Sequence, residues 1–170
     1  MPASYKVHIG VSLFLAGLTA IAVILTLLPG SPVVPAAAAF TLFGLAFPVF
    51  GSAMLRCYRT GILTLIQGPQ FPLLLWHTPR WLRAAAGSLA VGVVLCVVVG
   101  GVPASGQPER TAGGYYLNNH GDLQPVSRAT YESALKSRTR WFDAGATLFF
   151  AVSALMVAAA HRAEEEALDT

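Results

Sequence analysis

The sequence predicts an all-α integral membrane protein, a four-helix transmembrane bundle with a small β-hairpin-plus-helix insertion between its third and fourth helices. Hydrophobic residues make up 55% of the 170 residues and charged residues only 11%, whereas a soluble domain carries about 25% charged residues. No Asp, Glu, Lys or Arg occurs in 9–55, 84–108 or 144–160. Too few charges remain to cover a water-exposed surface, which disfavours a soluble enzyme, a nucleic-acid-binding protein and a disordered regulator.

Four apolar stretches have the length of a membrane-spanning helix. A helix rises about 1.5 Å per residue, so about 20 apolar residues cross a hydrocarbon core of about 30 Å. The predicted spans are residues 9–28, 33–55, 83–102 and 142–160. Backbone amides in lipid must be paired within their own segment, which favours helices. We expect 1–170 to form a single membrane domain, and the first stretch is longer than the apolar core of a secretory signal.

An even number of spans places both termini on the same side of the membrane. If that side is cytoplasmic, six basic residues face the cytoplasm and five face outward. The six are Lys6, Arg56, Arg59, Arg80, Arg83 and Arg162, and the five are Arg110, Arg128, Lys136, Arg138 and Arg140. Basic residues prefer the cytoplasmic side, and four of the six flank one compact loop. The prediction is a multi-pass cell-membrane protein with cytoplasmic termini and an extracytoplasmic segment 103–140.

The connection 56–82 is apolar but broken by glycine and prolines. Two interpretations stay open. The chain either lies along the membrane surface, with Trp76 and Trp81 at the level of the lipid headgroups, or it enters the membrane as a re-entrant loop that lines a ligand path.

The polar segment 103–140 is expected to contain a hairpin and the start of a helix. In order, the sequence predicts a linker over 103–114, a short strand over 115–117, a turn over 118–121 and a returning strand over 123–126. The turn residues tolerate positive φ, and Pro125 confines the returning strand to a sheet edge.

A helix is predicted to begin at Arg128, with Ser127 as its N-cap. No helix breaker follows before Arg162, so this helix and the fourth span should form one rod of about 35 residues. Glu132 and Lys136 stand four residues apart and are expected to pair on its surface.

The unit Gly114–Glu132 resembles a motif of uncharacterised small bacterial polytopic membrane proteins, G-x-Y-L-x-x-x-G followed by V-S-x-x-x-Y. The matching positions are Tyr116, Leu117, Gly121, Val126, Ser127 and Tyr131. The resemblance covers about 20 residues and implies no particular activity.

Small residues on each span are expected to mediate helix packing, because helices in lipid associate through close backbone approach. The third span carries the most regular stripe, Ala84, Ser88, Gly92, Cys96 and Gly100. The other sets are Ser12, Ala16 and Ala20 on the first span; Ala37, Thr41, Gly44, Pro48 and Gly51 on the second; and Thr147, Ala151, Ala154 and Ala158 on the fourth. We expect these sets to close an intramolecular bundle, and a homo-oligomer formed through the third-span stripe is the alternative.

No residue pattern predicts a catalytic, cofactor or metal site. The cores of the spans lack the ionisable residues that transporters and proton pumps use, and Asp143 at the mouth of the fourth span is expected to be an interfacial ion-pair partner. Cys57 and Cys96 form no redox motif, and the four histidines are scattered along the chain.

The function predicted from these features is that of a non-catalytic accessory subunit or partner-binding, receptor-like module that acts through the segment 103–140. The candidate partner-binding residues are Tyr115, Tyr116, Asn118, Asn119, His120 and Asp122. The expected partners are the lipid bilayer and another membrane or envelope protein, with no role for nucleic acid. The two tyrosines could instead anchor the hairpin to the bundle. An oligomeric channel or small-molecule pathway and a membrane-embedded enzyme are the alternative functions.

Overall fold

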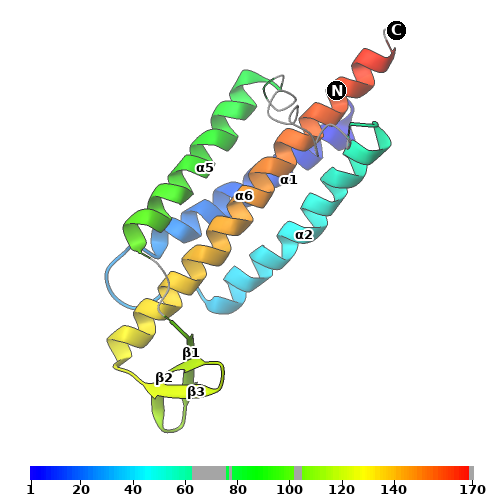
Figure 1. The fold of residues 1–170 in the computed structure, drawn as a ribbon. Helices are drawn as coiled ribbons and strands as arrows, with labels where there is room; N and C mark the ends of the chain where they lie inside the picture. Colours follow the sequence, from blue (N-terminus) through cyan, green and yellow to red (C-terminus); the bar gives the residue numbers. More distant parts are fainter. Residues whose placement is uncertain (63–75, 77, 102–104, 169–170) are drawn as a thin grey trace.

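The computed structural model describes residues 1–62, 76, 78–101 and 105–168, and contains four long helices and a small sheet (Figure 1). The helices are α1 (Ala3–Leu25), α2 (Ala36–Arg59), α5 (Arg80–Gly100) and α6 (Arg128–Leu168). Each is long and apolar enough to cross a membrane. The four predicted spans are therefore confirmed as helices, with bounds that differ by a few residues at most ends.

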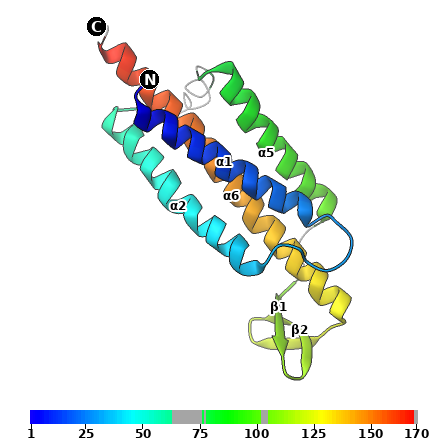
Figure 2. The same cartoon turned by 180° about the vertical axis from the view of Figure 1, so that it is seen from behind.

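Helix α6 lies at the centre of the bundle. It contacts the three other helices, and α1 runs along it in the opposite direction. Helices α2 and α5 flank this central pair on opposite sides, as two opposite views show (Figures 1 and 2). In the most apolar window of α6, 67% of the residues are buried, against 17% in α2 and in α5. The outward faces of the flanking helices carry exposed apolar side chains such as Phe47, Val91 and Val98, which suits a lipid environment.

The contact between α1 and α6 follows one antiparallel register. Three pairs of side chains share it at intervals of seven or fourteen residues on both helices. They are Tyr5 with His161, Thr19 with Thr147, and Thr26 with Arg140. A seven-residue interval keeps side chains on one face of two helices that cross at about 20°, which is the common packing of membrane and coiled-coil helices.

The small residues of the first and fourth spans are buried as predicted. All seven have an exposed fraction of 8% or less, and Ala16, Ala154 and Thr147 are fully buried. Close approach of these two backbones explains why α6 can also accept α2 and α5 as neighbours.

The second span packs through a different set of residues from the one expected. The five predicted positions, Ala37, Thr41, Gly44, Pro48 and Gly51, are exposed. Helix α2 instead buries Ala39, Ala46 and Ala53, which stand seven residues apart, together with Cys57. The same seven-residue interval that organises α1 and α6 therefore also organises α2.

The third-span stripe lies largely on the outer surface of α5. Ala84, Ser88 and Gly92 are exposed, whereas Leu82, Ala86 and Val93 are buried. A helix turns about 100° per residue, so each step of four residues drifts by about 40° around the axis. A stripe with strict four-residue spacing therefore winds away from a straight neighbour, and only its last two members are half-buried.

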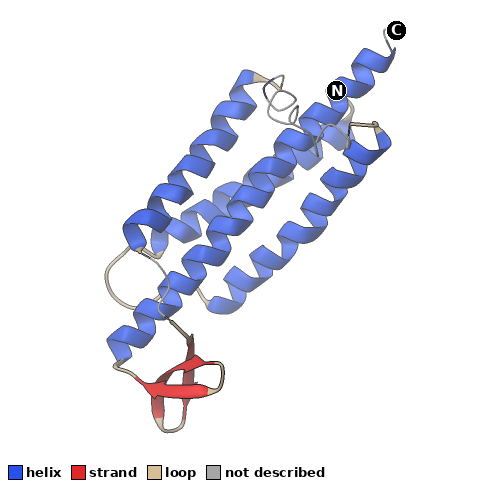
Figure 3. Cartoon of the chain, viewed as in Figure 1, coloured by secondary structure: helices blue, strands red, loops and turns tan. Residues whose placement is uncertain are grey.

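Three antiparallel strands form the sheet at the N-terminal end of α6 (Figure 3). They are β1 (Gln107–Thr111), β2 (Gly114–Asn119) and β3 (Asp122–Pro125), in the order β1-β2-β3. The predicted strand, turn and returning strand are confirmed. The turn residues His120 and Gly121 have φ values of 55° and 98°, as a type I′ turn requires.

Strand β1 corrects the linker predicted over 103–114. Its sequence, QPERT, has little intrinsic preference for strand, and Pro108 lacks a backbone donor. Pairing with β2 stabilises β1 as a strand despite this weak preference. Because β1 is an edge strand, it forms hydrogen bonds with a neighbouring strand on one side only.

The predicted N-cap and rod are both confirmed. The backbone N–H of Thr130 donates to Ser127 Oγ over 3.1 Å, and α6 then continues for 41 residues. Both termini lie at the end of the bundle opposite the sheet (Figure 1), as an even number of spans requires.

Most of the connection 56–82, including Gly68, Pro69 and His77, lies outside the described residues. Trp76 and Trp81 are described, and both side chains are exposed.

Candidate functional site at the sheet-bearing end

The two faces of the sheet have different surroundings. Successive strand residues point to opposite faces, so Tyr115 and Leu117 share one face of β2 and Tyr116 and Asn118 the other. The ring of Tyr115 packs on Tyr131 of α6, with 5.0 Å between ring centroids, and Leu117 is buried. The face of Tyr115 is thus the inner face, attached to α6, and the face of Tyr116 is the outer face.

The predicted partner-binding residues divide between these faces and the turn. Asn119, His120 and Asp122 are exposed at the turn, and the remaining three are half-buried. Tyr115 makes the anchoring contact that was the alternative role for the tyrosine pair. Tyr115 and Tyr116 are therefore adjacent in the sequence, but their side chains lie on opposite faces of the sheet.

A hydrogen-bonded asparagine braces the exposed turn. Asn118 Nδ2 donates to Glu109 Oε2 of β1 over 2.9 Å, and the Gly121 N–H donates to Asn118 Oδ1 over 2.8 Å. Next to this asparagine, a surface hollow of about 510 Å³ is lined by Gly106, Gln107, Asn118, Asn119, His120 and Gly121. The braced turn gives this hollow a fixed shape.

Both free edges of the sheet carry a proline. In a two-residue hairpin the pair next to the turn is hydrogen-bonded and the pairs then alternate. This alternation places Pro108, opposite Leu117, and Pro125, opposite Tyr116, at positions whose nitrogen points away from β2. The outer edges therefore lack a donor there, which disfavours the addition of another strand.

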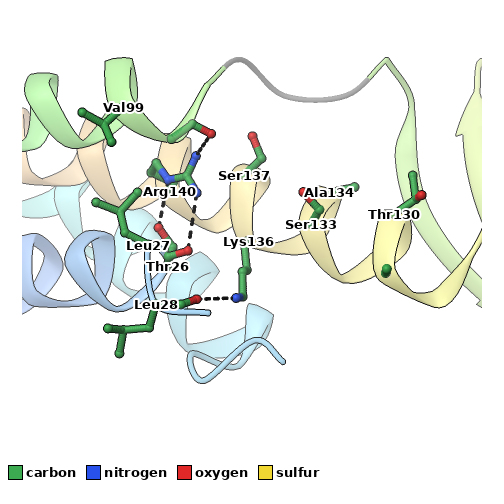
Figure 4. Close-up of a pocket in the computed structure, with 12 residues that line it drawn as sticks. Thr26, Leu27, Leu28, Val99, Thr130, Ser133, Ala134, Lys136, Ser137 and Arg140 are labelled. Atoms are coloured by element: carbon green, nitrogen blue, oxygen red, sulfur yellow. Dashed lines mark hydrogen bonds between the residues drawn. The ribbon is translucent and has the colours of Figure 1, made fainter. Parts of the chain in front are cut away.

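A buried arginine fastens α6 to the ends of α1 and α5 (Figure 4). The exposed fraction of Arg140 is only 5%. Its Nε donates to Thr26 Oγ1 over 2.9 Å, its Nη2 to the Thr26 carbonyl over 3.4 Å, and its Nη1 to the Gly100 carbonyl. Carbonyls at a helix C-terminus lack partners within the helix and carry partial negative charge. One guanidinium thus neutralises the ends of two helices.

A lysine one turn earlier makes a similar contact. Lys136 Nζ donates to the Leu28 carbonyl over 2.6 Å, just beyond the end of α1. Lys136 is near enough to Glu132 for Coulombic attraction, but the two form no direct ion pair among the described residues. Glu132 accepts from Arg128 Nε over 2.8 Å instead, since the carbonyl competes successfully for the ammonium group. We name the contacts of Arg140 and Lys136 with Thr26, Leu28 and Gly100 the basic clasp.

The Arg128 hydrogen bond also affects the ionisation of its partner. Glu132 lies in the polar part of α6, outside the predicted span 142–160, and it also accepts a hydrogen bond from Ser31. The hydrogen bond from Arg128 lowers the pKa of Glu132 below its usual value. The turn between α1 and α2 is thereby tied to the polar start of α6.

A pocket of about 720 Å³ opens beside the basic clasp. Its described lining includes the hydroxyl residues Thr130, Ser133 and Ser137 (Figure 4). Both cations of this lining, Lys136 and Arg140, are engaged with backbone carbonyls. The lining therefore offers hydroxyl groups rather than uncommitted positive charge, which argues that the clasp serves structure.

Asp143 does not form the predicted interfacial ion pair. Its side chain is fully buried, and within the described part of the chain neither carboxylate oxygen has a hydrogen-bond partner. Arg140, three residues earlier, is directed to Thr26 and Gly100 instead. Arg140 thus binds carbonyl oxygens at the ends of two helices rather than the carboxylate of Asp143.

The basic clasp was not predicted from the sequence. A signal for it exists, because Ser12, Thr19 and Thr26 stand seven residues apart on the first span, as do Arg140 and Thr147 on the fourth. Matching these two polar intervals in antiparallel order pairs Thr26 with Arg140. The small residues alone do not show this pattern, because Arg140 is not one of them.

Among the described residues, no group of three or more His, Cys, Asp or Glu side chains is placed to hold a metal ion. No protein-family model, curated protein or solved structure matches this chain.

Proposed function

We propose that this protein is a non-catalytic membrane protein that binds a partner protein through the outer face of its sheet. The partner is another membrane or envelope protein, and the segment 103–140 is extracytoplasmic in this proposal. The observation that carries the proposal is that the sheet projects beyond the end of the bundle (Figure 1), with one face held by α6 through Tyr115 and with Leu123 exposed on the other face.

Three contacts hold the sheet rigidly at the end of the bundle. Ser127 caps the start of α6, Tyr115 packs on Tyr131, and the basic clasp ties the following turns of α6 to the ends of α1 and α5. A surface that is already ordered loses less conformational entropy when it binds. Rigid mounting therefore favours a recognition surface over a mobile loop.

The outer face has the composition of a small protein-binding surface. Tyr116 and Leu123 provide apolar area, and the exposed fraction of Leu123 is 44%. Leu123 lies directly opposite Asn118 in the strand register, so it belongs to the same face. The polar residues Gln107, Glu109 and Asn118 surround this area. An aromatic and aliphatic centre with a polar rim is typical of protein interfaces.

Recognition is expected to use side chains rather than strand addition. Pro108 and Pro125 remove backbone donors from both outer edges, as described above. A partner that adds a strand needs those donors, so the outer face and the turn are the surfaces that remain.

The first experiment determines on which side of the membrane the sheet lies. Asn119→Cys is introduced into a chain in which Cys57 and Cys96 are both replaced by Ala, and intact cells are treated with a membrane-impermeant thiol reagent. Labelling of intact cells supports the proposed orientation. Labelling only after lysis contradicts it and moves the search for a partner to the cytoplasm.

The second experiment tests the outer face directly. A photoreactive amino acid is placed at Leu123 and, as a matched control, at the exposed neighbour Gln124, whose side chain points to the opposite face. We expect a cross-linked product of defined mass from position 123, little from position 124, and loss of the product with Tyr116→Ala. Equal products from both positions, or none from position 123, would contradict the proposal.

The oligomeric pathway stays the alternative function. Its support is the exposed stripe Ala84, Ser88 and Gly92 on α5, which would face a neighbouring copy. Gly92→Leu should then change both the oligomer mass in mild detergent and the ion conductance of the reconstituted protein, whereas the partner-binding function predicts neither change.

A further inference from the structure

A groove between α5 and α6 opens on the surface of the bundle. Its volume is about 330 Å³. The described lining comprises Trp76, Arg83, Ala86, Gly87 and Ala90, and Leu148, Ala151, Val152 and Leu155 of α6. The small side chains of α5 form a shallow floor, and Arg83 and Ala90 are seven residues apart. The groove therefore extends about 10 Å along the bundle, apolar except at the arginine.

Arg83 has unused hydrogen-bonding capacity at the end of this groove. Its Nε and Nη1 atoms are buried and have no hydrogen-bond partner within the described part of the chain. The guanidinium carbon lies 4.4 Å from the centre of the Trp76 ring. An aromatic face attracts a cation, but it does not replace an oxygen acceptor. Arg83 is half-buried, and a partly desolvated cation without an acceptor is costly, which points to an anion that binds there.

The surroundings of Arg83 match the interface of a membrane. Arg83 lies in the first turn of α5, and the N-cap of this helix, Pro79, provides no side-chain cap. Backbone N–H groups at such a helix start also favour an anion. The exposed Trp76 ring is of the kind that resides at the level of the lipid headgroups. Charge and depth therefore both suit a lipid whose head is anionic.

We propose that the groove binds one anionic phospholipid. The phosphate group accepts hydrogen bonds from the guanidinium of Arg83, whose side chain is half-buried at the end of the groove, and an acyl chain lies along Gly87 and Ala90 against Leu148 and Val152. A fork of guanidinium donors suits phosphate oxygens, and the apolar walls suit a hydrocarbon chain. This site lies at the opposite end of the bundle from the sheet, so it does not depend on the proposed partner binding.

Native mass spectrometry of the full chain in mild detergent tests the site. The protein is titrated with dioleoyl phosphatidylglycerol and, separately, with dioleoyl phosphatidylcholine. We expect tighter binding of phosphatidylglycerol and a loss of about tenfold in its affinity with Arg83→Gln, as for removal of one charge-assisted hydrogen-bonded contact. Arg80→Gln is the matched control, because Arg80 is exposed one turn earlier on the same helix.

A second pair of variants tests the apolar part of the groove. Gly87→Leu fills the floor and leaves the arginine in the sequence, and Gly92→Leu adds the same side chain to another exposed position of α5; an added Cβ meets no atom within 4 Å at either glycine. Only Gly87→Leu should weaken lipid binding. An unchanged melting temperature shows that each variant is folded.

Three results would overturn the proposal. They are equal affinity for the two lipids, equal losses with the two arginine variants, and unchanged binding with Gly87→Leu. Addition of glycerol 3-phosphate distinguishes a lipid from a free phosphate, because competition at equal concentrations would show that the acyl chain contributes nothing.

Discussion

The hydroxyl groups of Thr19 and Thr147 share a hydrogen bond of 2.8 Å in the middle of the contact between α1 and α6. Both side chains are fully buried. The bond lies one seven-residue interval from the basic clasp, so the same register carries a neutral polar pair at its centre and a charged contact at its end.

The central pair should contribute modestly to stability. In a double-mutant cycle with Thr19→Val and Thr147→Val, we expect a coupling free energy of about 0.6 kcal/mol, the mean for such bonds between membrane helices. Each hydroxyl also has a backbone acceptor in its own helix, which limits the loss. The free energies of unfolding are measured by denaturation in mixed micelles. A coupling close to zero would show that the two hydroxyls act independently.

Loss of the arginine should have a larger effect. Arg140→Gln leaves carbonyls of Thr26 and Gly100 without their cationic donor, and we expect a decrease of about 3 kcal/mol in the free energy of unfolding. Arg162→Gln, at an exposed position of the same helix, should change stability little. A similar decrease for both variants would assign the effect to net charge rather than to the basic clasp.

Gly100 should tolerate no side chain. A Cβ atom at this position would overlap the Arg140 guanidinium, whereas a Cβ at Gly92 meets open space. Gly100→Ala should therefore lower the melting temperature by several degrees, and Gly92→Ala should leave it unchanged or raise it slightly, because alanine favours helix. The double variant Gly100→Ala with Arg140→Gln should lose less than the sum of the two single effects, since both disturb one contact.

The face that α2 presents to α6 can be tested with leucine. Ala46 has an exposed fraction of 1%, so Ala46→Leu should overpack the interface and cost about 1–3 kcal/mol. Gly44→Leu, two residues earlier on the outer face, should be tolerated. If Gly44→Leu destabilised the protein more than Ala46→Leu, the packing residues first expected from the sequence would be supported instead.

The turn between β2 and β3 should depend on its positive φ values. A β-branched residue is strained at positive φ, so Gly121→Val should increase amide hydrogen exchange throughout β2 and β3. His120→Gly should leave the exchange unchanged, because glycine accepts the same conformation freely. Equal exchange for both variants would show that the turn does not determine the stability of the hairpin.

The sequence predicted the elements better than their contacts. Span length, the absence of charge and the cap at Ser127 act locally, and they correctly placed four helices, the rod of α6 and the hairpin. Strand β1 was missed because its pairing with β2, rather than its own composition, makes it a strand.

The packing faces were harder to predict. Small residues occur on every side of α2 and α5, so their presence alone does not identify the buried side. The seven-residue spacing of Ala39, Ala46 and Ala53 was the more informative signal, because it matches the period at which two inclined helices meet. The basic clasp needed the antiparallel register of α1 and α6, which no single span contains.

The continuity of α6 has a mechanical consequence. A helix of 41 residues measures about 60 Å, and it runs without a joint from the sheet to the opposite end of the bundle. Because the basic clasp fixes its polar part to two other helices, the sheet cannot swing as an independent arm. A load applied to the sheet is therefore borne by the whole bundle, and it reaches the far side of the bundle as a tilt of one rigid body.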